Sequence, residues 1–401
     1  MNVFGVIAEY NPFHNGHKFQ LEIARDLGAT HIVAVMSPNF VQRGEPSITD
    51  KFYRAKAAVK SGIDLVLELP TTYALSSAEM FAFGGVYILD KLQIIDNLIF
   101  GAETDDIKIL ENIVKCLESD ALKKKLTEIL KKGYSFPKSR QIALENFIDK
   151  TIINEIEKPN NILAIEYLKW IKRLKSNIKP VLIKRKGTIH DKKDISQNMM
   201  TSALNLRDMI KDNRKIEVWK KFVPSSAYEI YKEVFNKEAL PVFEKNGERA
   251  IISKLRSIDI DDIKMIPDIS EGIENRIFKS IRNFSSLDEI YNDIKTKRYT
   301  MSRVRRAIYN LYLDLKLEYL KFSPQYIRVL AINKKGTEIL SKIKKQNINI
   351  CVDNNLNRLS KINKIAKLSA DIEIKATNMY SLFGENILPC NIDLTHKFEI
   401  D

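Results

Sequence analysis

Residues 3–24 read VFGVIAEYNPFHNGHKFQLEIA. The apolar, β-branched run Val3–Ala8 predicts a strand, and the apolar residues of 17–27 recur at helical spacing and predict a helix. A strand that enters a helix through a short turn is the first half of a βαβ unit. This stretch therefore predicts a parallel sheet with a loop, HNGH at 14–17, at the carboxyl end of its first strand.

The same alternation continues as far as residue 100. Strands are expected at 31–35, 64–69 and 97–100, and helices at 49–59, capped by Ser47 or Thr49, and at 76–92. The pattern indicates an α/β, Rossmann-like parallel sheet with helices on both faces. Ligands of such sheets bind outside the carboxyl ends of the strands, which selects three loops: 9–16, 37–46 and 101–105.

The rest of the chain is expected to be more helical. Residues 105–176 have a helical pattern, with a helix opening at 160–161, and 180–184 has the pattern of one more strand. Short charged helices follow residue 215, and a mixed α/β stretch lies near 329–352. We expect a catalytic domain over 1–215 and a mainly α-helical, basic C-terminal domain over 216–401.

The HNGH turn has residue types suited to phosphate. A helix N-terminus leaves backbone N–H groups unpaired, and Gly16 lets the backbone approach a ligand closely. His14 and His17 can add imidazole N–H donors aimed at the charge that develops on a phosphoryl group. The alternative is an ordinary turn with two exposed histidines.

Composition limits the class of protein. The 401 residues contain 65 Lys+Arg and 51 Asp+Glu, a net charge of +14 that is concentrated in 151–200 and 301–350. The N-terminus lacks the pattern of a secretory signal, and the longest apolar run, Met80–Leu89, is too short to span a bilayer. The three cysteines are widely spaced, which argues against a zinc site or a disulfide framework. We expect a cytoplasmic protein with no membrane partner.

Several sequence blocks resemble one known family. HNGH at this position is similar to the HIGH signature of the nucleotidyltransferase superfamily, and EYNPFHNGH at 9–17 resembles a block of the bacterial tRNA(Met) cytidine acetate ligase family. Further matching blocks are MSPNFVQRGEP at 36–46, DLVLELP at 64–70, FGAE at 100–103, PNNIL at 159–163, EYL at 166–168, IKRKG at 183–187 and HD at 190–191. Pro38 stands where the family usually has Gly, which makes this loop stiffer and removes one backbone donor.

The resemblance implies an ATP-dependent ligase. Such an enzyme forms acetyl-adenylate from acetate and ATP, then transfers acetyl to the wobble cytidine of elongator tRNA(Met) to give N4-acetylcytidine. ATP is then the co-substrate, together with Mg²⁺, and tRNA and acetate are the other partners. No metal ligand of the protein is predicted.

The resemblance also implies site residues. His14 and His17 would be catalytic. ATP would be bound by Ile7, Ala8, Glu9, Tyr10, Asn11, Pro12, Phe13, His14, Asn15, Gly16, His17, Lys18, Phe19, Gln20, Gly101, Asn160, Asn161, Arg185, Ser202 and Arg207. The last two belong to a second phosphate motif, roughly Ser-x-Thr-x-x-Arg, in which Leu204 replaces the threonine.

Some of these residues have a second interpretation. Asn161 can cap its helix or face the nucleotide, and Arg185 can bind phosphate or be a solvated charge beside two lysines. In the long loop after the second strand, Arg43 can hold a small carboxylate or a phosphate. Glu45 can be the ion-pair partner of Arg43 or an anchor of the loop.

A basic stretch in the C-terminal half is the candidate RNA surface. On a helix, Arg303, Arg306 and Tyr309 or Tyr312 recur at i+3 spacing and predict a basic face edged by aromatic rings. Arginines neutralise RNA phosphates and aromatic rings stack on unpaired bases, although a run of charges is more often a solvated face. The predicted tRNA-binding residues are Lys297, Arg298, Arg303, Arg305 and Arg306.

Two other functions fit part of the sequence. A small-molecule nucleotidyltransferase of the same superfamily would explain HNGH equally well, but it would leave the C-terminal half and its basic window without a role. A non-catalytic RNA-binding protein with a degenerate nucleotide fold would explain Leu204, but not the complete HNGH and Arg207.

Overall fold

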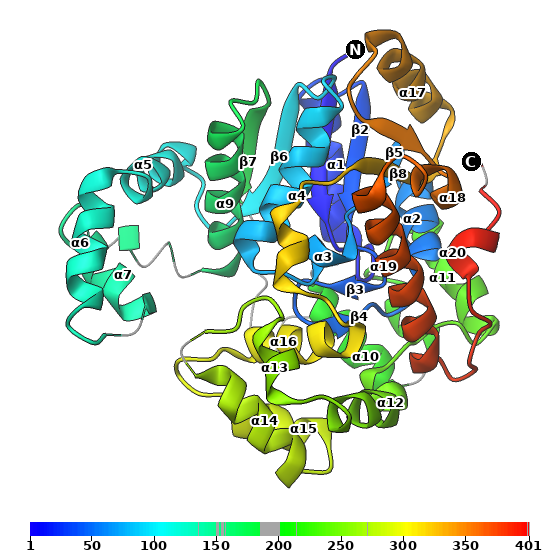
Figure 1. Cartoon of the computed structure of the whole chain (residues 1–401). Coiled ribbons are helices and arrows are strands. Elements are labelled where there is room, and N and C mark those ends of the chain that lie inside the picture. Colours follow the sequence, from blue (N-terminus) through cyan, green and yellow to red (C-terminus); the bar gives the residue numbers. More distant parts are fainter. Residues whose placement is uncertain are drawn as a thin grey trace.

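The computed structural model describes residues 1–134, 136–149, 152–153, 156, 158–184, 201–213, 215–270, 272–398 and 400. A seven-stranded sheet in the order β7-β6-β1-β2-β5-β8-β9 runs through the molecule (Figure 1). Its strands are β1 Val3–Ala8, β2 His31–Met36, β5 Leu65–Glu68, β6 Asn97–Ala102, β7 Lys179–Lys184, β8 Tyr326–Ile332 and β9 Cys351–Asp353. The strands β1, β2, β5, β6 and β7 are mutually parallel, so the Rossmann-like α/β prediction is confirmed.

Two layers of helices cover the sheet because successive side chains of each strand point to opposite faces. Val33 and Val35 pack on one face with α4 and α9, whereas Ile32 and Ala34 pack on the other with α1, α2 and α11. The helices of this region are α1 Asn15–Asp26, α2 Lys51–Lys60, α3 Thr71–Ala74, α4 Ala78–Lys91, α5 Ile107–Leu117, α6 Asp120–Leu130, α7 Phe136–Leu144, α9 Pro159–Arg173, α10 Ala203–Asn213 and α11 Ser225–Asn236, with the 3₁₀ turn η1 Ile216–Trp219.

The strand order reverses beside β1. The chain proceeds from β1 to β2 and β5 on one side, then returns to place β6 and β7 on the other. The crevice outside the carboxyl ends of β1 and β6 is therefore the switch point at which such sheets bind ligands. HNGH follows β1 and Gly101 lies near the end of β6, so both predicted blocks lie at this crevice.

The sheet does not end at the expected domain boundary after residue 215. β8 pairs antiparallel with β5, and β9 extends the sheet beyond β8. The helix α17 Lys334–Gln346 then packs back on the sheet, with Gly336 so close to the Asp64 carbonyl oxygen that a Cβ would lie 2.1 Å from it. Residues after 215 thus comprise both a helical lobe and a segment that completes the sheet.

The helical lobe has its own apolar core. It is formed by α12 Glu244–Arg256, α13 Ile260–Lys264, α14 Ile273–Asn283, α15 Leu287–Ile294 and α16 Met301–Leu313. Phe40, from the loop after β2, enters this core, so the lobe lies against the carboxyl edge of the sheet (Figure 1). The remaining elements are η2 Leu317–Lys321, α18 Leu356–Leu359, α19 Lys364–Tyr380, η3 Ser381–Phe383 and α20 Ile392–Thr395.

Local predictions differ from the structure at two points. The N-cap of α2 is Asp50 rather than Ser47 or Thr49, because the Asp50 carboxylate accepts from the N–H groups of Phe52 and Tyr53. The expected loop 37–46 contains a small hairpin, β3 Phe40–Val41 with β4 Glu45–Pro46. Among the described residues, no helix is long and apolar enough to cross a membrane.

Candidate active site

His14 and His17 form a reciprocal cap at the start of α1. His14 is the N-cap residue, and its Nδ1 accepts from the N–H of Gly16 at 3.0 Å. The Nδ1 of His17 accepts from the backbone N–H of His14 at 3.2 Å, and the two rings stack with centroids 3.8 Å apart. An imidazole that accepts at Nδ1 carries its proton at Nε2. Both rings are therefore oriented as Nε2–H donors, the form that can hydrogen-bond a phosphoryl oxygen.

Aromatic neighbours hold this cap. Tyr10 lies edge-on to His17 with ring centroids 4.8 Å apart, and the Phe13 ring lies 5.4 Å from His17. The backbone N–H of Phe13 donates to the hydroxyl of Tyr231 on α11 at 2.8 Å. Burial raises the pKa of Tyr231, so this hydroxyl keeps its proton. Tyr231 thus fixes the loop from within the helix layer that also contains α1.

Residues 7–20 extend from the last two residues of β1 through this cap into α1. Ile7 and Ala8 are partly buried at the end of the strand, and Pro12 is buried in the loop. The Gln20 side chain donates to the Ile99 carbonyl of β6 at 2.9 Å, which joins α1 to the neighbouring strand. Lys18 and Phe19 lie in the first turns of α1.

The loop after β6 and the start of α9 are fastened to each other. The Glu103 carboxylate accepts from the N–H of Asn161 at 2.9 Å and from the side-chain amide of Asn160 at 2.6 Å. In return, the Asn161 amide oxygen accepts from the N–H of Glu103 at 2.9 Å. The Asn161 amide oxygen thus caps the loop after β6 rather than its own helix, and the assignment of Asn161 to ATP stays a prediction. Gly101 lies directly before this loop.

The second phosphate motif, which contains Ser202 and Arg207, contacts the loop that carries HNGH. Ser202 accepts from the N–H of Asn205 at 3.2 Å and so caps α10, while Leu204 points outward and is 44% exposed. Arg207, one turn further, donates to the carbonyl oxygen of Asn11 at 2.8 Å. The structure therefore brings Arg207 to the loop that carries His14. Arg185 and residues 190–191 lie outside the described residues.

Charged side chains from three elements gather beside this loop. Glu45 pairs with Arg207 at 2.7 Å and with Arg305 of α16 at 3.5 Å. Of the two interpretations of Glu45, pairing with Arg43 or anchoring of the loop, the structure shows ion pairs with Arg207 and Arg305 instead of Arg43, which is exposed. Burial raises the pKa of Glu9, and the positive charge of Arg43 offsets part of this rise.

A buried arginine binds backbone carbonyl groups of the loops after β1 and β2. The Arg54 guanidinium, on α2, donates to the carbonyl oxygen of Glu9 at 2.6 Å, to that of Thr49 at 3.1 Å and to that of Pro38. Arg54 is fully buried. One side chain thus cross-links the loop after β1, the loop after β2 and the start of α2.

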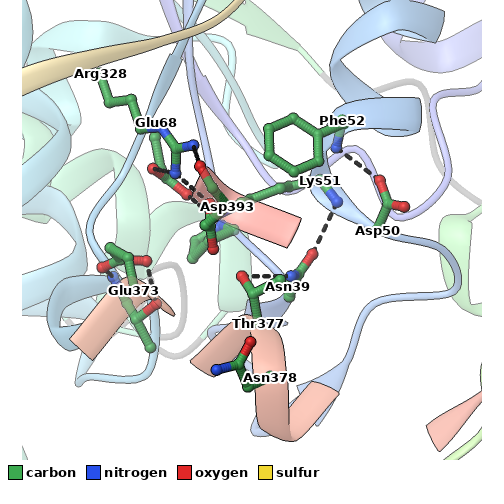
Figure 2. Close-up of polar contacts among 12 residues, drawn as sticks. Asn39, Asp50, Lys51, Phe52, Glu68, Arg328, Glu373, Thr377, Asn378 and Asp393 are labelled. Atoms are coloured by element: carbon green, nitrogen blue, oxygen red, sulfur yellow. Dashed lines mark hydrogen bonds and ion pairs between the residues drawn. The ribbon is translucent and has the colours of Figure 1, made fainter. Parts of the chain in front are cut away.

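A buried charge cluster supports the same edge of the sheet (Figure 2). Lys51 pairs with Glu68 at 2.5 Å and with Asp393 of α20 at 2.7 Å, and Arg328 of β8 contacts both carboxylates. Burial acts to lower the pKa of Lys51, but the charges of Asp393 and Glu68 outweigh it and the pKa is raised. Two cations and two carboxylates balance in a region without solvent, as buried charges require.

A fifth titratable side chain, Glu373, borders this cluster. Glu373 of α19 accepts from the N–H and the hydroxyl of Thr71, both at 2.6 Å. Burial, followed by the negative charge of Glu68, raises the pKa of Glu373 to about 8. Asn39 then connects the cluster to the loop after β2, since it accepts from the Lys51 N–H at 2.8 Å and donates to Thr377 at 3.1 Å (Figure 2).

The predicted RNA face on α16 differs from expectation. Tyr309 and Tyr312 are fully buried in the lobe core, so the prediction of an aromatic edge was wrong. Arg306 is also buried and pairs with Asp268 at 3.1 Å. The i+3 spacing correctly placed these residues on one face, but that face packs inward.

The remaining predicted RNA residues are divided between surface and interior. Arg303 donates to the carbonyl oxygen of Asp268 at 2.8 Å, and Arg305 faces Glu45. Lys297 and Arg298 are exposed in the turn before α16. Their assignment to tRNA stays a prediction.

Sequence reasoning did not identify Arg54, Lys51, Arg328 or Asp393 as important, and it noticed Glu68 only within the DLVLELP block. Charged residues are seldom fully buried, so their expected place is the surface. Charged side chains can be buried only when they form ion pairs or hydrogen bonds with other segments of the chain. No local sequence pattern predicts such contacts. Glu103 was noticed within the FGAE block, but its role as a cap for α9 needs the tertiary contact.

Comparison with known proteins gives consistent findings. The chain matches the family model described as HIGH Nucleotidyl Transferase over residues 1–391. It is 41% identical over 405 residues to the tRNA(Met) cytidine acetate ligase of Clostridium kluyveri, covering 96% of each chain. It is 42% identical over 354 residues to the protein of that name from Thermosipho melanesiensis, covering 86% of this chain and 82% of the relative.

Two solved structures are similar over 100% of both chains. The crystal structure of Thermotoga maritima TmcAL bound with alpha-thio ATP has a TM-score of 0.92 and 34% identity to this chain. The apo form of that protein has a TM-score of 0.93 and 35% identity. The similarity therefore includes the helical lobe and the strands that complete the sheet.

Proposed function

The chain belongs to the HIGH nucleotidyl transferase family, and on that premise we propose that it is an ATP-dependent tRNA(Met) cytidine acetate ligase. The observation that carries the proposal is the reciprocal cap of His14 and His17 at the switch point of the sheet. It presents two oriented N–H donors and a helix N-terminus where a nucleotide phosphate would bind. Relatives about 40% identical over nearly the whole chain carry the ligase name.

The first chemical step would activate acetate. A carboxylate oxygen of acetate attacks the α-phosphorus of ATP, the bond to the β-phosphate oxygen breaks, and pyrophosphate leaves. Charge develops on the oxygens of the α-phosphate in the transition state. Donors that are already oriented, such as the Nε2–H groups of His14 and His17, stabilise this charge without reorganising.

The second step would acylate the tRNA. The exocyclic amine of the wobble cytidine attacks the acetyl carbon of acetyl-adenylate, loses a proton and displaces AMP. The acceptor named by the relatives is a cytidine of tRNA(Met), and acetate is the acid in that name. We place the reaction in the cytoplasm, because that is where its tRNA acceptor is found.

Mg²⁺ would enter with the nucleotide. In the described part of the chain, no three His, Cys, Asp or Glu side chains are grouped as metal ligands. Mg²⁺ is commonly held by substrate phosphates and water with few protein ligands. The metal would neutralise phosphate charge, while the protein orients the triphosphate through the cap.

The alternative is a small-molecule nucleotidyltransferase of the same superfamily. It accounts for the cap equally well. The relatives that match along nearly the whole chain are named as tRNA ligases, which supports the ligase instead.

The test uses variants that keep the cap but remove the imidazoles. His14→Asn retains an N-cap side chain, and His17→Gln retains a residue that can return a hydrogen bond to the cap. We expect the double variant to acetylate tRNA about 100- to 1,000-fold more slowly, the usual cost of losing such donors, with its melting temperature nearly unchanged. The assay measures labelled acetate bound to the base after nuclease digestion of the tRNA.

The matched control is His31→Gln, at the opposite, amino-terminal end of β2. It should acetylate tRNA at the wild-type rate. If the double variant did so as well, the assignment of the cap to catalysis would be wrong. Transfer of AMP to a small acceptor in the absence of RNA would favour the alternative function.

A further inference from the structure

Glu45 lies between two guanidinium groups that come from distant parts of the chain. Its Oε1 is 2.7 Å from Nη2 of Arg207 on α10, and its Oε2 is 3.5 Å from Nη1 of Arg305 on α16. The exposed fractions of the three side chains are 17%, 11% and 27% respectively. The pair of arginines therefore forms a partly enclosed seat for an anion, and a carboxylate of the protein fills it.

This seat borders the loop that carries the histidine cap. Arg207 also donates to the carbonyl oxygen of Asn11, three residues before His14. The Asn11 side chain in turn accepts from the N–H of Ile48, just beyond Glu45, at 2.7 Å. The two loops are thus bound together, and an anion on the cap would lie near the seat.

The helical lobe reaches the seat because α16 is docked on the loop after β2. Gly44 has a φ of +76°, and a Cβ there would lie 2.5 Å from the backbone nitrogen of Arg306. Arg306 also donates to the carbonyl oxygen of Gln42 at 3.3 Å. Only glycine permits this approach without strain, so the turn of α16 that carries Arg305 is held against the loop.

Arg305 has hydrogen-bonding capacity to spare. Its Nε is buried and has no partner among the described residues. Its second carboxylate neighbour, Glu244, is at 3.8 Å, which is an ion-pair distance rather than a hydrogen bond. Carboxylate and phosphate oxygens match the guanidinium fork equally well, so a phosphate can take the place that Glu45 holds.

We propose that Arg207 and Arg305 together bind a phosphate group of ATP, and that the Glu45 carboxylate occupies their seat in the nucleotide-free protein. This inference rests on the proposed function and assigns Arg305 to the nucleotide rather than to tRNA. When the triphosphate binds, the Glu45 side chain turns away while Gly44 keeps the loop on α16. Glu45 thus lowers the apparent affinity for ATP to a fraction of its intrinsic value, and that fraction equals the share of molecules in which the seat is free.

The experiment measures binding of ATP to the full chain by titration calorimetry at one fixed salt concentration. Glu45→Gln removes the competing charge, and we expect it to bind ATP about tenfold more tightly, the value for a seat that is free in one molecule of ten. Arg305→Gln should bind ATP about tenfold more weakly. A gain in affinity on changing Glu45 cannot result from damage to the fold.

Two controls isolate the phosphate. Asp261→Asn removes an exposed carboxylate of the helical lobe, one that pairs with Lys264 at 2.8 Å, and it should leave ATP affinity within twofold of wild type. Adenosine, which has no phosphate, should bind wild type and Glu45→Gln equally. Equal tightening for adenosine, or the same or weaker ATP binding by Glu45→Gln, would overturn the proposal.

The wild-type protein separates this inference from the proposed function. If it binds ATP and acetylates tRNA but Glu45→Gln gains no affinity, the seat is wrong and the ligase stands. If the wild type binds no ATP, both are wrong.

Discussion

The buried carboxyl of Glu373 leads to a specific dependence of stability on pH. Glu373 is 2% exposed, and burial together with the charge of Glu68 raises its pKa from 4.5 to about 8. Between these values the unfolded chain releases the proton of Glu373, whereas the folded protein retains it. Because the folded state then binds more protons, the contribution of Glu373 to stability is greatest below about pH 4.5 and falls as pH rises towards 8.

The size of this effect follows from the two pKa values. One proton retained by the folded state alone costs about 1.4 kcal/mol for each pH unit. The interval of about 3.5 units therefore sets an upper limit of about 5 kcal/mol. Glu373→Gln removes the titration and keeps an amide oxygen for the N–H of Thr71. Relative to wild type, the variant should gain stability steadily between pH 5 and pH 8.

The assay is urea unfolding of wild type and variant at pH 5, 6, 7 and 8. The difference between the two proteins at each pH cancels the other titrating groups. Glu22→Gln, a change in an exposed ion pair with Lys18, is the control and should follow wild type at every pH. A constant difference between wild type and Glu373→Gln would show that Glu373 is ionised in the fold, and the charge balance of the cluster in Figure 2 would be wrong.

Four further variants, one of them a control, test the packing of the fold and the loops. Gly336→Ala would place a Cβ 2.1 Å from the carbonyl oxygen of Asp64, and urea unfolding should show a loss of about 3 kcal/mol. Gly133→Ala, with a positive φ but open space around it, should lose only about 1 kcal/mol, and equal losses would contradict the predicted clash. Arg54→Lys keeps the charge but not the fork, so the three loop carbonyls lose donors and the KM for ATP should rise several-fold. An unchanged KM would exclude a positioning role for Arg54. Asp50→Ala removes the cap of α2 and should cost about 1 kcal/mol in thermal unfolding while leaving the KM for ATP unchanged, and no loss would mean that the cap is dispensable.

The sheet and the nucleotide loop could be predicted because their signals are local. A short apolar run such as Val3–Ala8, followed by a helical pattern, is stable only as a buried strand of a parallel sheet. The strands of 31–36 and 97–102 repeat that pattern. The HNGH turn combines a glycine with two histidines at a strand-to-helix junction, so its place in the fold follows from its place in the sequence. The family resemblance extended this prediction to Arg207, which lies far away in the chain yet meets the same loop.

The wrong predictions concern side chains whose spacing fits a solvent-exposed helix face and a buried helix face equally well. The spacing of Arg306, Tyr309 and Tyr312 correctly indicated one helical face, but spacing does not say whether the face meets solvent or a neighbouring helix. Burial of Arg306 became favourable only when Asp268 supplied a partner charge. Such a pairing between distant residues has no local pattern.

The sequence by itself determined the parallel sheet, the histidine cap and the edge at which a nucleotide would bind, since each depends on residues close together in the chain. Tertiary structure alone decided that β8 returns to pair with β5, that Arg54 holds three loop carbonyls, and that Glu45 lies between Arg207 and Arg305. The physical reason is that a buried charge is stable only beside a compensating group. That group can come from anywhere in the chain, so the fold has to bring it there.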